Sequence, residues 1–133
     1  MSTEQTAQRF IEALGRLEAG RDVESIVALF REDCEVGNVV SPEKFAGRAG
    51  AREFWGAKYR DTFGEVRSTF RNVFAADGRA ALEWTTEGTG RDGAHVKYDG
   101  VSILEIEGGL IKRFRAYFDA GRLGRQLTEG AGA

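Results

Sequence analysis

The sequence has little cysteine, histidine and proline, with one of each among 133 residues. Cys34 alone cannot form a disulfide within the chain, and together with His95 it supplies too few ligands for a transition-metal site. A phosphate-binding loop and a dinucleotide glycine fingerprint are also missing from the sequence. We therefore expect no metal and no cofactor.

The sequence also lacks an excess of one charge and a long apolar run. Lysine and arginine number 19 and aspartate and glutamate 21, so the net charge is −2. That balance gives no attraction to nucleic acid or to an anionic membrane. The polar N-terminal segment has no apolar signal core, and no run reaches the roughly 20 apolar residues of a membrane span. We expect a cytoplasmic protein without nucleic-acid or membrane partners.

What the sequence does contain is enough apolar material for one core. Hydrophobic residues make up 41% and charged residues 30%, a normal globular mixture. The length favours one domain over residues 1–129, followed by a loose tail over residues 130–133.

The first half of the chain shows apolar residues at helical spacing. Residues 7–17 form one stripe that ends before Gly20, and Asp22 is placed to cap a second helix over residues 23–30. A third helix is predicted from near Gly50 to Thr62, and the stretch 34–40 between them favours a strand. Residues 41–46 are expected to be irregular, because Pro42 interrupts regular structure.

The second half changes to strand patterns separated by glycine turns. Four runs cover residues 65–75, 79–88, 95–106 and 110–119, and glycine-containing pairs such as Asp77-Gly78 and Gly108-Gly109 divide them. Such pairs favour tight hairpin turns. We predict an α+β fold in the order α-α-β-α-β-β-β-β. We expect a curved, mixed or antiparallel sheet that wraps around the three helices of the N-terminal half, closed at one end and open at the other.

A turn at Gly108-Gly109 also predicts the pairing of the last two strands, with Glu107 opposite Leu110. Strand alternation then gathers most of the polar residues of these strands on one face: Tyr98, Ser102, Arg113, Arg115, Tyr117 and Asp119. The opposite face carries apolar residues: Val101, Ile103, Phe114, Ala116 and Phe118. One β-bulge would exchange these faces. We expect one face to line a pocket and the other to form a dimer contact.

The order of elements, with the segments 8–14, 26–30 and 52–55, resembles the nuclear transport factor 2-like superfamily, near its SnoaL-like and ketosteroid isomerase-like branches. The end of the last strand, residues 109–119, is also similar to limonene-epoxide hydrolases. The resemblance implies a cone with a deep pocket and a homodimer through the sheet. It does not fix the chemistry, since the superfamily includes isomerases, cyclases, hydrolases and binding proteins.

The residues that match the family's catalytic positions depart from its isomerases. Asn38 stands where such an isomerase has its general base, Phe10 where it has a tyrosine, and Ser102 where it has a protonated aspartic acid. An amide cannot accept a proton at neutral pH, so steroid isomerisation by that mechanism is not expected. The hydrolase pattern retains an aspartate at Asp119 and an asparagine at Asn38, which together would hold a water.

We therefore take Asp119 and Asn38 as the candidate catalytic residues. Asp119 would be desolvated on the pocket face, unless it forms an ion pair with Arg113 or Arg115 instead. The candidate ligand-binding residues provide flat walls or hydrogen-bonding groups: Phe10, Trp55, Trp84, Tyr98, Ser102 and Tyr117. Packing alone also accounts for the aromatic members of this set.

Two functions remain open from the sequence. One is a pocket for a small hydrophobic or polycyclic molecule with cofactor-free acid–base chemistry of isomerase, cyclase or hydrolase type. The other is a non-catalytic homodimeric domain for ligand binding or interaction, which would have kept the fold and lost the isomerase residues.

Overall fold

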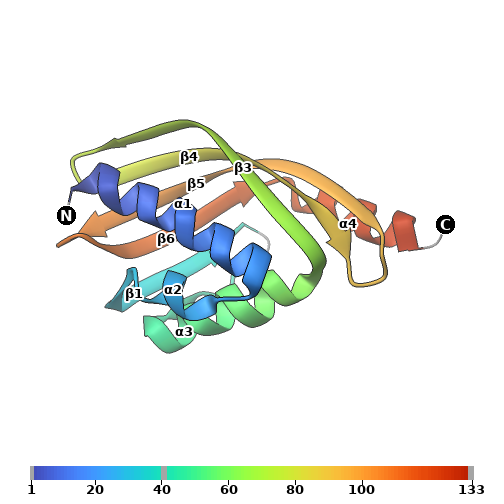
Figure 1. The fold of residues 1–133 in the computed structure, drawn as a ribbon, viewed down its shortest axis with the longest axis horizontal. Helices are drawn as coiled ribbons and strands as arrows, with labels where there is room; N and C mark the ends of the chain where they lie inside the picture. The colour runs from blue at the N-terminus through green and yellow to red at the C-terminus, as the bar shows by residue number, and fades with distance from the viewer. Residues whose placement is uncertain (1, 40–41, 132–133) are drawn as a thin grey trace.

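The computed structural model describes residues 2–39 and 42–131, and the described chain forms four α-helices and a mixed sheet of six strands (Figure 1). The helices are α1 (Thr3–Gly20), α2 (Val23–Val27), α3 (Gly47–Glu53) and α4 (Ala120–Ala131). The strands are β1 (Phe30–Asn38), β2 (Phe45–Ala46), β3 (Phe63–Ala76), β4 (Arg79–Gly90), β5 (His95–Glu107) and β6 (Leu110–Phe118). The predicted α+β order is confirmed, with β2 and α4 in addition.

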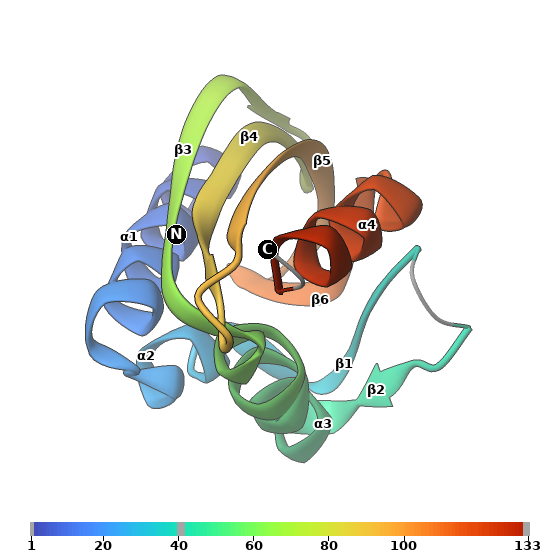
Figure 2. The same ribbon diagram turned by 90° about the vertical axis from the view of Figure 1, so that its right-hand side faces the viewer.

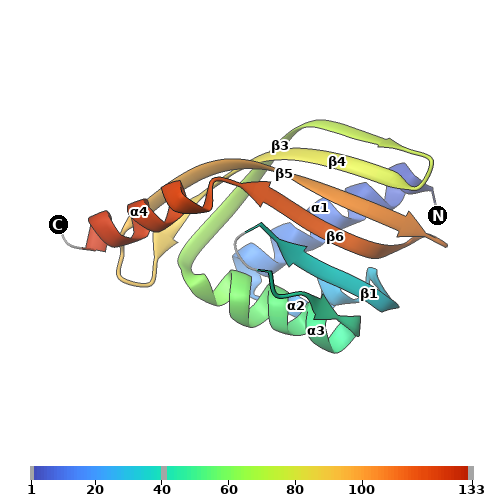
Figure 3. The same cartoon turned by 180° about the vertical axis from the view of Figure 1, so that it is seen from behind.

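The sheet is open and has the strand order β2-β1-β6-β5-β4-β3. Strands β3 to β6 form the predicted antiparallel meander, and β1 joins β6 in parallel, so that β6 lies between β1 and β5 (Figure 3). Seen along the long axis of the molecule, β3, β4 and β5 form an arc, with α1 beside β3 (Figure 2). This curvature gives the sheet an inner face that the helices cover.

Helix α1 shows why the first segment folds as predicted. Ser2 and Gln5 form a capping box at its start, and Arg21 ends it in a left-handed conformation that bonds back to Arg16 and Leu17. The apolar stripe, which includes Phe10, is buried against the sheet. The helix therefore covers the inner face along its length.

The predicted third helix is real but is divided into three parts. Helix α3 continues into a π-helical segment, η1 (Phe54–Tyr59), and a short 3-10 turn, η2 (Arg60–Thr62). The wider π-helical turn is a local irregularity of the kind often found at functional sites. The expectation of irregular chain over residues 41–46 was wrong in part, because Phe45 and Ala46 form β2 against Val36 and Glu35. Residues 40 and 41 lie outside the described chain.

The predicted pairing of β5 with β6 is correct at the turn and wrong beyond it. Glu107 faces Leu110, but an irregularity between Glu105 and Ile106 shifts the register by one residue. Such an extra residue turns every following side chain to the other side of the strand. The inner face therefore carries Phe114, Ala116 and Phe118 together with Tyr98, Ser102 and Leu104, while Arg113, Arg115 and Tyr117 face outward.

Helix α4 was not predicted, because Asp119 was assigned to the last strand. The chain instead ends β6 at Phe118 and starts a helix, with the Asp119 carboxylate accepting a hydrogen bond from the Arg122 backbone N–H at 2.9 Å. The helix runs to Ala131, into the predicted tail, whose residues 132 and 133 lie outside the described chain. In the described part of the chain, no helix is long and apolar enough to cross a membrane.

Helix α4 is fastened where β5 extends beyond β6. The last pair between these strands is Gly100 with Phe118, so the β5 backbone at Lys97 has no strand partner on that side. The Gln126 side-chain amide accepts from the Lys97 N–H at 2.8 Å and donates to its carbonyl at 3.0 Å. The Gln126 side chain thus forms the hydrogen bonds that a neighbouring strand would form with Lys97, and it holds α4 at the end of the sheet.

Candidate functional site

A cavity of about 330 Å³ lies between the inner face of the sheet and the two helical segments α1 and η1. Most of its lining side chains are apolar or aromatic: Phe10, Leu14, Phe45, Phe54, Trp55, Tyr59, Phe63, Phe70, Trp84, Tyr98, Phe114, Ala116, Phe118 and Leu123. The remaining lining residues are polar: Asn38, Glu43, Lys58, Thr62, Ser68, Thr86 and Ser102. The cavity is therefore a ring-lined space with polar groups at a few positions.

The wall of the cavity on the sheet side is ordered in rows, because opposite residues on paired strands point to the same face. One row is polar and consists of Ser68 on β3, Thr86 on β4 and Tyr98 on β5, which are successive Cα partners. In the next row Phe70 pairs with Trp84. The polar row thus lies directly beside an aromatic one.

Gly100 makes room in the aromatic row for the large ring of Trp84. A Cβ on Gly100 would lie 2.5 Å from two atoms of that ring. The Trp84 indole N–H donates to the Ser102 hydroxyl at 2.9 Å, which fixes the ring in place. The rings of Trp84 and Tyr98 are perpendicular, with 5.5 Å between their centroids. This wall is rigid because its rings are held by packing and by a hydrogen bond.

The opposite wall is built around Trp55 from the π-helical segment. Its ring contacts Phe10, Phe54 and Phe114 at centroid distances of 4.9–5.7 Å. Trp55 is 3% exposed, and its indole N–H has no hydrogen-bond partner within the described residues. This wall therefore has an unused hydrogen-bond donor. Burial of a donor without a partner is energetically unfavourable.

Behind the polar row lies a buried carboxylate, Glu18 of α1, which is 6% exposed. One of its oxygens accepts from the Tyr59 hydroxyl and from the Ser68 hydroxyl, each at 2.6 Å. The other accepts from the Ser68 backbone N–H at 2.8 Å. The Ser68 oxygen lies 2.7 Å from the Thr86 hydroxyl, which extends the network onto the cavity wall. We call Glu18, Tyr59, Ser68 and Thr86 the Glu18 network.

The tyrosine hydroxyls at this wall keep their protons. Burial, with the Glu18 charge as a second cause, raises the pKa of Tyr59 well above its usual range. Burial likewise raises the pKa of Tyr98, with a smaller contribution from Glu18. Tyr98 is 5% exposed, and its hydroxyl has no hydrogen-bond partner among the described residues. Both groups therefore act as donors or neutral acceptors rather than as bases.

Six of the eight residues singled out from the sequence line this cavity: Phe10, Asn38, Trp55, Trp84, Tyr98 and Ser102. The other two do not. The β-bulge turns Tyr117 outward, where it is 42% exposed and its hydroxyl accepts from Arg115 at 3.2 Å. Asp119 lies past the end of the strand, exposed, as the cap of α4. The expectation that Asp119 is desolvated on the pocket face was wrong. The alternative, an ion pair with Arg113 or Arg115, is not formed among the described residues either: Arg113 pairs with Glu35 and Glu105, and Arg115 bonds to Tyr117.

The Glu18 network was missed by the sequence reading. Glu18 follows the apolar stripe of α1 directly after Leu17, and a helical projection places it at the edge of that stripe. Ser68 and Thr86 alternate with exposed residues on strands, so their faces were predictable. The contact of Ser68 with the Glu18 carboxylate depends on how α1 packs on β3, which no local pattern specifies.

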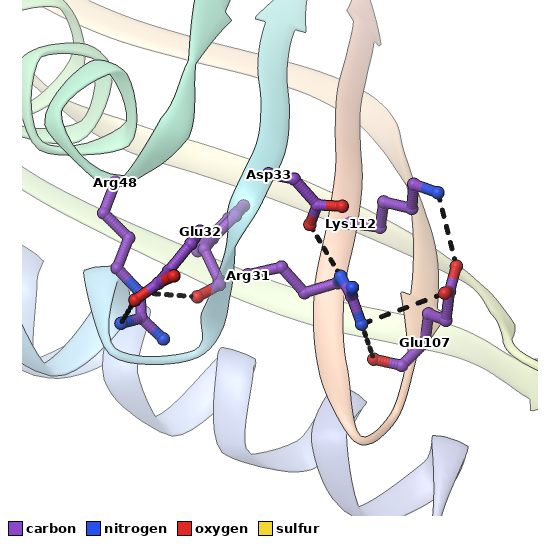
Figure 4. Close-up of polar contacts among 7 residues, drawn as sticks. Arg31, Glu32, Asp33, Arg48, Glu107 and Lys112 are labelled. Atoms are coloured by element: carbon purple, nitrogen blue, oxygen red, sulfur yellow. Dashed lines mark hydrogen bonds and ion pairs between the residues drawn. The ribbon is translucent and has the colours of Figure 1, made fainter.

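Other charged clusters of the described chain lie at the surface, away from the cavity. Around the β5–β6 turn, Arg31 pairs with Asp33 at 2.7 Å and bonds to the Glu107 carbonyl, and Lys112 pairs with Glu107 at 3.4 Å (Figure 4). Exposed pairs of this kind contribute little to stability. The described residues contain no group of histidine, cysteine and carboxylate side chains placed to hold a metal ion.

A curved mixed sheet around an N-terminal helix, with an apolar cavity on its inner face, defines the cone-like α+β class of small-molecule pocket folds. The sequence matches the family model of the SnoaL-like domain over residues 7–114. The chain belongs to this family, within the nuclear transport factor 2-like superfamily. Among curated proteins, none matches this sequence.

Three solved structures illustrate the likeness. TerC, co-crystallised with polyporic acid, is 20% identical, with a TM-score of 0.81, over 95% of this chain and 98% of that one. An NTF2-like protein of unknown function from Burkholderia pseudomallei is 21% identical, with a TM-score of 0.81, over 96% and 99%. An epoxide hydrolase from M. tuberculosis, similar to limonene-epoxide hydrolase, is 20% identical, with a TM-score of 0.72, over 97% and 94%. At these identities the likeness establishes the fold alone.

Proposed function

We propose that this protein binds a small hydrophobic molecule with a flat ring system in the cavity between α1, η1 and the inner face of the sheet. The observation that carries the proposal is the lining, in which rings from both walls face one space of about 330 Å³. Apolar cavities with a few polar groups are the usual form of small-molecule sites. The co-crystallisation of TerC, which has the same fold, with polyporic acid supports a small-molecule ligand.

The volume restricts the size of the ligand. Small-molecule sites have volumes of roughly 300–1,000 Å³, so this cavity is near the lower limit. Trp84 and Trp55 are held by neighbouring rings and do not move aside at low cost. We therefore propose a ligand of one or two fused rings rather than a larger polycyclic molecule.

Of the two functions that the sequence left open, ligand binding without acid–base catalysis by Asp119 is the better supported. The Asp119 carboxylate caps α4 in contact with solvent and does not line the cavity. Asn38 does line it, at the end of β1, and we propose that its amide contacts the ligand. Isomerase, cyclase or hydrolase chemistry would need a base from another lining residue.

Filling the cavity tests this function. Ala116 lies on the cavity wall and is 7% exposed, so Ala116→Phe places a ring where the ligand would lie. We expect at least a tenfold loss of affinity for naphthalene, measured by calorimetric titration. The matched control is Ala81→Phe on the outer face of β4, which should bind like the parent protein. Failure of the parent to bind naphthalene or related two-ring compounds would contradict the proposal.

We also propose that two copies associate through the outer face of β5 and β6 and that the protein is cytoplasmic. Tyr117 is exposed on this face, and Val101, its Cα partner, and Ile103 are partly exposed beside it. Apolar groups in the centre of a charged sheet face favour a symmetric contact. The buried free thiol of Cys34 is compatible with a reducing compartment.

Light scattering after size exclusion tests the dimer. The parent is expected at twice its chain mass of 14.6 kDa. Val101→Glu buries a charge in the proposed contact and should shift the protein to the monomer mass. Val73→Glu, an exposed position on β3, is the control and should leave the dimer intact. A parent protein that is monomeric at micromolar concentration would refute the association.

A further inference from the structure

The hydrogen bonds to Glu18 determine which hydroxyl groups of the polar row donate and which accept. Tyr59 and Ser68 each donate to the Glu18 carboxylate at 2.6 Å, and short bonds to a charged acceptor are the strongest in the network. With its own proton committed, the Ser68 oxygen accepts from the Thr86 hydroxyl at 2.7 Å. Thr86 therefore presents lone pairs, and no proton, to the cavity.

Tyr98 presents the opposite character at the neighbouring position. It is the Cα partner of Thr86, so the two side chains leave the sheet about 5 Å apart on the same face. Its hydroxyl lines the cavity with no partner among the described residues, and burial keeps it protonated by raising its pKa. The row thus offers a hydrogen-bond acceptor and a hydrogen-bond donor from two paired residues on the same face, inside an apolar space.

We propose that the cavity recognises the neutral hydroxyl group of an aromatic alcohol, a phenol or naphthol, seated between Thr86 and Tyr98. Such a hydroxyl donates a hydrogen bond to the Thr86 oxygen and accepts one from the Tyr98 hydroxyl. The acceptor and the donor of the row then both have a partner. The aromatic ring then lies beside Trp84, next to the polar row. This inference rests on the proposed ligand-binding function and adds the chemical class.

The same geometry discriminates against two related classes of molecule. A hydrocarbon of equal shape leaves Tyr98 without a partner, which loses the hydrogen bonds that a hydroxyl would form. An aromatic carboxylate has no proton for Thr86 and places its negative charge near that of Glu18, in a site where water does not screen it. The expected order of affinity is hydroxyl first, hydrocarbon second and carboxylate last.

The experiment compares 2-naphthol, naphthalene and 2-naphthoate by calorimetric titration at pH 7. With the parent protein we expect 2-naphthol to bind at least tenfold more tightly than naphthalene, and 2-naphthoate more weakly than either. Tyr98→Phe and Thr86→Val keep side-chain size and remove one partner each. Each should bring the affinity for 2-naphthol to within about threefold of the affinity that the same variant has for naphthalene.

Thr85→Val is the matched control, because Thr85 is the next residue of β4 and its hydroxyl contacts Arg71 and Asp99 on the outer face. It should retain the full preference for 2-naphthol. Equal binding of 2-naphthol and naphthalene by the parent would overturn the inference and leave the proposed function standing. Binding of none of the three would overturn both. An unchanged preference in both Tyr98→Phe and Thr86→Val would likewise overturn the assignment of the row.

Discussion

Replacing Glu18 with glutamine is expected to lower the free energy of unfolding by about 3 kcal/mol. The carboxylate accepts three hydrogen bonds in a buried position, from the Tyr59 hydroxyl and from the hydroxyl and backbone N–H of Ser68. Hydrogen bonds to a charged group contribute about 1.5–3 kcal/mol each, and an amide has one acceptor oxygen in place of two. At least one buried donor therefore loses its partner.

The loss should appear as a lower midpoint in urea denaturation followed by circular dichroism. Glu12→Gln is the matched control, because Glu12 lies exposed on the same helix and, among the described residues, bonds only to Gln8, at 3.4 Å. A surface change of this kind is expected to stay within about 0.5 kcal/mol of the parent. Equal midpoints for the two variants would show that the Glu18 network does not stabilise the fold as described.

The substitution Gly100→Ala is expected to destabilise the protein by about 2 kcal/mol and to abolish ligand binding. The added methyl would lie 2.5 Å from the Trp84 ring and 2.6 Å from the Tyr117 carbonyl oxygen, closer than real Cβ contacts allow. Overpacking in a well-packed region costs about 1–3 kcal/mol. The clash with the ring is relieved if Trp84 turns into the cavity and leaves Ser102, whereas the clash with the carbonyl requires the β6 backbone to shift.

Near-ultraviolet circular dichroism reports the displaced indole, and titration with naphthalene reports the loss of the cavity. Gly15→Ala makes the same change in α1, where nothing lies within 4 Å of the new methyl. Alanine is favoured over glycine inside a helix by roughly 0.5–1 kcal/mol, so this control should be slightly more stable than the parent. A Gly100→Ala protein with parental spectrum and parental affinity would contradict the assigned packing of Trp84.

Local patterns in the sequence predicted most of the fold. The stripe of α1, the cap at Asp22 and the glycine turn at Gly108-Gly109 act between neighbours along the chain, so they can be recognised without coordinates. The family resemblance added the cone and its pocket. Helix α4 also carried a local signal that was not used: Asp119 as a cap, followed by Leu123 and Leu127 four residues apart.

The sequence by itself determined the order of helices and hairpins, because periodicity and turn chemistry are properties of short segments. It also identified four of the ring side chains that line the cavity: Phe10, Trp55, Trp84 and Tyr98. Tertiary structure decided the polar part of the site. The bulge between Glu105 and Ile106 determines on which face of the sheet Tyr117 lies. The packing of α1 on β3 places Glu18 in contact with Ser68, which is 50 positions away in the sequence. Such contacts depend on how whole helices and strands are placed relative to one another. The strand period of two residues and the helix period of 3.6 residues do not specify that placement.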